Sequence, residues 1–117
     1  MKLFVADATP ELLKKLKGIP IVEEYDDADT VLVLPGGLEA MLYLLKGINE
    51  GKDVFLYNKD SFYARVIGTF YQLYEEGRKD KMPFEYMTIE SQFEEIVRKL
   101  EEKKNEKIND GKTSQLL

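Results

Sequence analysis

The chain has 117 residues, of which 44% are hydrophobic, and this length and composition predict one domain with one core. Lys and Arg number 17 against 22 Asp and Glu, which gives a net charge of −5. This balance argues against a protein that binds nucleic acid by neutralising phosphates, because that class carries a surplus of positive charge. The sequence contains no Cys and no His, so it lacks disulfides, thiol nucleophiles and the commonest zinc ligand and general base.

No segment of the sequence indicates a membrane, a metal or a cofactor. No stretch reaches the ~18–20 apolar residues of a membrane span. The N-terminus MKLFVAD meets a polar residue at Asp7 and lacks the layout of a signal peptide, so we expect a cytoplasmic protein. The acidic run EEYDDAD at residues 23–29 lacks the spacing and the central glycine of an EF-hand, which favours a solvated turn over a metal site.

Short apolar runs alternate with segments of helical periodicity along the whole chain, and this pattern is typical of a parallel sheet wound by right-handed crossovers. Pro20 places the second apolar run at an edge of the sheet, because proline cannot donate to a strand ladder. Strands are predicted at residues 2–6, 19–22, 31–34, 53–57 and 84–88, and helices at residues 10–17, 38–49, 62–76 and 91–100.

The predicted fold is a single α/β domain over residues 1–101, an open parallel sheet of about five strands with helices on both faces. We expect the Rossmann-like or flavodoxin-like strand order 2-1-3-4-5, in which the first and third strands are neighbours. Residues 102–117 form a polar C-terminal extension, predicted to be a frayed helix or disordered.

The segment TVLVLPGGLEAMLY at residues 30–43 is the centre of the predicted binding site. A strand buried on both faces leads through a glycine turn into a helix, whose first amides have no internal partner. These amides and the helix dipole favour an anion or a hydroxyl group. Polar residues that follow two other strands are expected at the same crevice. The predicted ligand-binding residues are Asp7, Pro35, Gly36, Gly37, Leu38 and Asn58.

Several short motifs resemble the LOG (Lonely Guy) family of Rossmann-like proteins, also described as lysine decarboxylase-like. The matches are Pro35-Gly36-Gly37, Leu56-Tyr57-Asn58, Asp60, Phe62-Tyr63 and Glu75-Glu76-Gly77, within roughly the C-terminal two-thirds of the chain. The resemblance implies a nucleotide or nucleoside as ligand, because characterised members look like phosphoribohydrolases that cut an N-glycosidic bond. It also implies a homodimer through the central helices, for which the apolar candidates are Met41, Leu44, Leu45, Ile48, Phe70, Tyr71 and Tyr74.

The chain departs from the LOG motif PGG-x-GT-x-x-E at the positions that carry catalysis. Glu39-Ala40 replaces the family's Gly-Thr, and Tyr43 replaces its catalytic Glu. A carboxylate ~4 Å from a phosphate costs about 4 kcal/mol at an effective dielectric near 20. We therefore predict a nucleotide- or nucleoside-binding protein without the full catalytic set. The alternatives are a nucleoside or nucleotide N-glycosidase that uses Glu39, and a non-catalytic regulatory or interaction protein.

Overall fold

The computed structural model describes the backbone of residues 1–59, 62–78 and 87–116, and within these ranges the side chains up to residue 106. The strands are β1 (Leu3–Ala6), β2 (Thr30–Val33), β3 (Asp53–Tyr57) and β4 (Met87–Glu90). The helices are α1 (Pro10–Lys15), α2 (Leu38–Asn49), α3 (Phe62–Glu75) and α4 (Phe93–Leu116), with a 3-10 turn at Tyr25–Asp27.

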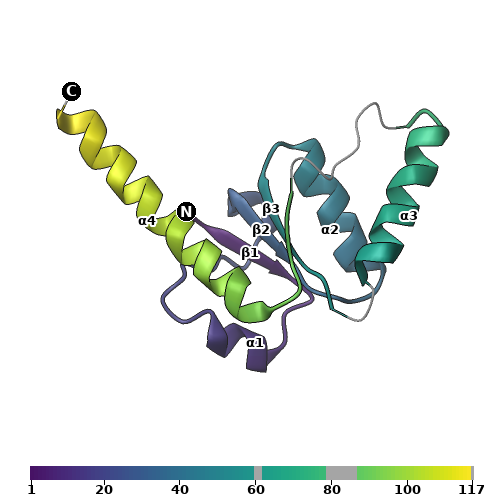
Figure 1. The fold of residues 1–117 in the computed structure, drawn as a ribbon, viewed down its shortest axis with the longest axis horizontal. Helices are drawn as coiled ribbons and strands as arrows, with labels where there is room; N and C mark the ends of the chain where they lie inside the picture. The colour runs from purple at the N-terminus through teal and green to yellow at the C-terminus, as the bar shows by residue number, and fades with distance from the viewer. Residues whose placement is uncertain (60–61, 79–86, 117) are drawn as a thin grey trace.

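All the strands pair in parallel, in the order β1-β2-β3-β4, and helices lie on both faces of the sheet (Figure 1). The predicted fold class, an open parallel α/β sheet, is therefore confirmed. Within the described residues the sheet has four strands, one fewer than the predicted number of about five.

The predicted second strand, residues 19–22, is reduced to one bridge between Ile21 and Leu3. The Leu3 amide donates to the Pro20 carbonyl and the Val22 amide to the Leu3 carbonyl, both at 2.8 Å. The bridge lies on the side of β1 that faces away from β2, at the edge that Pro20 predicts. Pro20 has no N–H and the acidic run follows at once, so the pairing has no room to lengthen.

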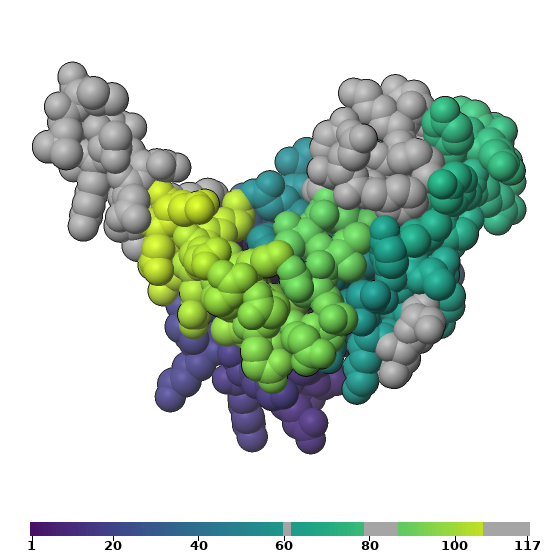
Figure 2. Space-filling model, in the orientation of Figure 1, coloured from purple at the N-terminus to yellow at the C-terminus, as the bar shows by residue number. Residues whose placement is uncertain are grey.

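Successive residues of the central strand β2 point to opposite faces of the sheet, and each face carries its own core. Val31 and Val33 pack in the cluster with α2 and α3, whereas Leu32 packs with α1 and α4. All four residues of β2 are buried, and so is Leu34, which explains the apolar run at residues 31–34. Phe93, Ile96 and Leu100 of α4 pack in the cluster with Leu32 and Phe55 of the sheet, and Figure 2 shows the yellow-green residues of α4 on the face turned to the viewer.

The helix α4 continues well past its apolar stripe, which ends at Leu100. Beyond that point two lysines hold the helix against the domain. Lys103 forms an ion pair with Asp53 at the start of β3. The Lys104 ammonium donates to the Gly18 carbonyl at 2.7 Å. Figure 1 shows the remainder of α4 projecting beyond the sheet.

Candidate functional site

The winding of the sheet reverses between β1 and β2, which places a crevice at their carboxyl ends. After β1 the chain crosses through α1 to the bridge at Ile21, on the outer side of β1. After β2 it crosses through α2 to β3, on the opposite side. The two connections therefore leave in opposite directions, and open α/β sheets bind their ligands at such a point.

Asp7 follows β1 directly and has two costly features. Its φ of 59° lies in the left-handed region. Among the described residues other than glycine, Asp7 alone has a positive φ. Its Oδ2 atom is buried and has no hydrogen-bond partner among the described residues. An unsatisfied buried polar atom costs about 1–3 kcal/mol, so folding stability alone does not explain this arrangement.

The Asp7 side chain lies against the turn that follows β2. A Cβ built on Gly36 would be 1.8 Å from Oδ2 of Asp7, 2.6 Å from Cγ and 3.1 Å from Cβ. Only glycine leaves room for the carboxyl group at this distance. The two loops predicted to form the crevice therefore meet, and Asp7 and Gly36 are the residues in contact.

The second glycine of the turn has a different role, because it opens the N-terminus of α2. Gly37 is the N-cap residue, and no side chain caps the helix. A Cβ on Gly37 would meet no atom within 4 Å, and its φ of −88° suits any residue. The first amides of α2 thus have neither an internal nor a capping partner at a point with free space beside it.

The side chains that follow Gly37 are either exposed or packed in the core. Leu38 is 75% exposed. Tyr43, which the LOG resemblance would place at that family's catalytic Glu, packs against the rings of Phe4 and Tyr25 in the core. Glu39 lies exposed in the first turn of α2, and Pro35 is half-buried before the glycines.

Asn58 lies at the same edge of the sheet, but it has a structural task. Its Oδ1 atom accepts a hydrogen bond from the Tyr63 amide at 2.9 Å, and its own amide donates to the Glu90 carbonyl at 2.8 Å. Asn58 therefore fixes the start of α3 against the ends of β3 and β4. The turn before α3 contains two residue types that commonly cap helices, Asp60 and Ser61, and both lie outside the described residues.

Tyr25 is the centre of a polar and aromatic cluster that the sequence does not predict. The ring is 4% exposed and lies 5.8 Å from the Phe4 ring, centroid to centroid. Its hydroxyl donates to Glu50 at 2.9 Å, and the ammonium groups of Lys52 and Lys46 lie over the ring at 3.9 and 4.5 Å from its centroid. These contacts tie the acidic connector to α2 and to the start of β3.

We expect the stability of the protein to fall above about pH 10 through Tyr25. Burial, the hydrogen bond to Glu50 and the charges of Glu50 and Asp26 raise the pKa of the phenol above its ordinary 10.0. The folded state thus keeps the proton that the unfolded chain loses, so the contribution is present below pH 10 and is lost as pH rises further. Denaturant melts between pH 8 and 11 measure the decline. Tyr25→Phe should flatten it, whereas Tyr74→Phe, at an exposed ring, should not.

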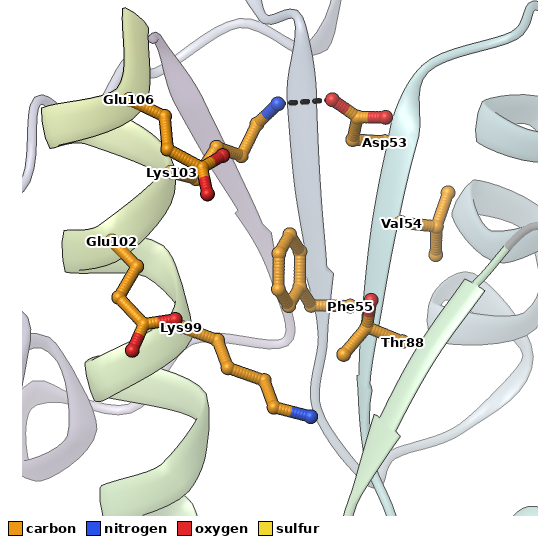
Figure 3. Close-up of a pocket in the computed structure, with 8 residues that line it drawn as sticks. All are labelled: Asp53, Val54, Phe55, Thr88, Lys99, Glu102, Lys103 and Glu106. Atoms are coloured by element: carbon orange, nitrogen blue, oxygen red, sulfur yellow. Dashed lines mark hydrogen bonds and ion pairs between the residues drawn. The ribbon is translucent and has the colours of Figure 1, made fainter. Parts of the chain in front are cut away.

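A groove of about 370 Å³ lies between α4 and the sheet (Figure 3). The Phe55 ring points toward α4 at its floor, and Lys99 and Lys103 extend over it from the helix. Both ammonium groups are used, since Lys99 pairs with Glu90 and Lys103 with Asp53. The two cationic groups of the groove are therefore engaged in ion pairs within the domain.

Comparison with known proteins gives no relative from which to transfer a function. The chain matches no protein-family model, no curated protein and no solved structure. The LOG resemblance thus stays a prediction from the residues. Among the described residues there is no group of three or more acidic side chains placed to hold a metal ion. No helix in the described ranges has both the length and the apolar character to cross a membrane.

The side chains expected at a dimer interface are mostly used within the domain. Leu44 and Phe70 are buried in the core between the sheet and its helices. Tyr71 and Tyr74 are exposed on α3. Met41, Leu45 and Ile48 are partly buried against the same core. A homodimer stays a prediction.

Proposed function

We propose that this protein binds a nucleoside or a nucleotide in the crevice between β1 and β2, on a LOG-like scaffold without the family's full catalytic set. The ligand would lie over the Gly36-Gly37 turn, with the amides of α2 as donors and the Asp7 carboxylate as acceptor. Hydroxyl groups of a sugar fit this pairing, because they donate to a carboxylate and accept from an amide. Asn58 would act by holding the neighbouring loop.

The conformation of Asp7 is the observation that carries this proposal. A left-handed backbone and a buried carboxylate oxygen without a partner both lower stability. Strain of this kind concentrates at ligand sites, where the surrounding structure imposes it for function. Asp7 carries this strain at the switch point of the sheet and beside the uncapped N-terminus of α2. Both places favour ligand binding for reasons that do not depend on the strain.

Gly37 provides the direct test, because a Cβ added there meets no atom within 4 Å and its φ suits any residue. Nucleosides and their mono-, di- and triphosphates are screened by thermal shift on the purified protein. A ligand at 100 times its Kd should stabilise the fold by about 2.7 kcal/mol, a shift in Tm on the order of 10 °C at this chain length. Gly37→Trp should abolish the shift. Gly68→Trp is the matched control, since Gly68 is exposed on α3 and also has free space for a Cβ.

A flat thermal response across the panel would reject the nucleotide or nucleoside function. A shift that survives Gly37→Trp would place the ligand elsewhere on the molecule. The N-glycosidase alternative depends on Glu39, which is exposed directly after the glycine turn. It is supported only if a bound nucleoside or nucleotide is cleaved to the free base and Glu39→Gln stops the release.

A further inference from the structure

We infer that the crevice selects uncharged nucleosides over nucleoside phosphates, an inference that rests on the function proposed above. Two carboxylates flank the Gly36-Gly37 turn. The Asp7 carboxyl group packs against Gly36, and Glu39 is in the first turn of the helix that Gly37 opens. A phosphate at the α2 amides would thus be close to two negative charges of the protein.

No basic residue offsets these charges in the two loops that form the crevice. The segment after β1, residues 7–9, reads DAT, and the segment from the end of β2 into α2, residues 34–41, reads LPGGLEAM. The next loop carries an exposed lysine, Lys59, but it follows β3, one strand further from the switch point. Phosphate sites commonly add Lys or Arg to the helix dipole, and here the dipole acts alone against two carboxylates.

The surface beside the turn suits the uncharged parts of a nucleoside. Leu38 and Leu42 are 75% and 55% exposed, and their spacing of four residues places them on one face of α2. An apolar face of this kind matches a base, while Asp7 and Glu39 are acceptors for the hydroxyl groups of ribose or for an amino group. The crevice thus combines acceptors and an apolar surface, and it lacks the cations that a phosphate requires.

The test compares adenosine, guanosine, cytidine and uridine with their 5′-monophosphates by isothermal titration at low salt. We expect at least one nucleoside to bind about tenfold or more tightly than its monophosphate. Glu39→Gln should raise the affinity for the monophosphate about fivefold to tenfold relative to that for the nucleoside, because it removes one repulsive charge and keeps an oxygen acceptor. Glu101→Gln is the control, since it makes the same charge change at an exposed position on α4.

The possible outcomes separate this inference from the proposed function. Equal or tighter binding of the monophosphates would overturn the selection for uncharged ligands but leave the nucleotide-binding function in place. The same conclusion follows if Glu101→Gln has as large an effect as Glu39→Gln, because the discrimination would then reflect the net charge of the protein. Absence of binding by both ligand classes would overturn the inference together with the function.

Discussion

Replacing Gly36 with alanine is expected to destabilise the protein by about 2–3 kcal/mol, the upper part of the range for overpacking. The added methyl group would overlap Oδ2 of Asp7 at 1.8 Å and Cγ at 2.6 Å. Rotation of the carboxyl group does not remove the conflict, because Cβ of Asp7 is itself only 3.1 Å away. Urea denaturation measures the loss as a lower midpoint with an unchanged slope. Gly37→Ala is the matched control, since a Cβ there meets nothing within 4 Å.

The same clash predicts a rescue by a second substitution. Asp7→Gly removes the whole side chain, the unpaired oxygen and the left-handed strain, so alone it should stabilise the protein by about 1 kcal/mol. In the Asp7→Gly background, Gly36→Ala should cost less than about 0.5 kcal/mol, which gives a coupling free energy near 2 kcal/mol. Equal costs in both backgrounds would show that Asp7 does not lie against Gly36. Stabilisation by Asp7→Gly together with loss of nucleoside binding would support a ligand role for Asp7.

The elements at the centre of the sheet could be predicted from local sequence, whereas the extent of the edge strand could not. An apolar run that ends at Pro35-Gly36-Gly37 indicates a buried strand followed by a turn. The helix α2 begins at Leu38 and ends at Asn49 as predicted. The run at residues 19–22 has similar composition but forms only the bridge at Ile21. Its length depends on how far the neighbouring β1 offers free backbone groups, and that is a tertiary property.

The candidate site shows the same division between local and tertiary information. The sequence predicts that Asp7 and the glycine turn share the crevice, because strand order determines which loops meet. It does not predict their contact, the buried oxygen of Asp7 or the positive φ, since these depend on how closely the two loops approach. For Asn58, the closing of a turn and a ligand contact are both compatible with the sequence, and in the structure its Oδ1 accepts a hydrogen bond from the Tyr63 amide in the first turn of α3.

Tyr25 is the clearest case of a residue whose role depends on distant partners. It is in an acidic run whose local pattern indicates a solvated turn, and all its charged neighbours in residues 23–29 are exposed. The ring is nevertheless buried, because Phe4 and Tyr43 approach it from β1 and α2. The signal available in the sequence is a single aromatic residue among acids, ahead of a buried strand. The connector is thus a structural anchor at the amino end of β2, the end opposite the crevice.

Tyr25→Ala is accordingly expected to have the largest effect of the substitutions considered, a loss of about 3–4 kcal/mol in the free energy of unfolding. It removes a buried ring, its contacts with Phe4 and Tyr43, the hydrogen bond to Glu50 and the stacking of Lys52. Tyr25→Phe should cost only about 1 kcal/mol, because it loses the hydrogen bond alone. Tyr74→Ala, at an exposed ring on α3, should change stability by less than about 0.5 kcal/mol. Denaturant melts rank the three variants, and a Tyr25→Ala protein as stable as Tyr74→Ala would show that the connector is not anchored by this ring.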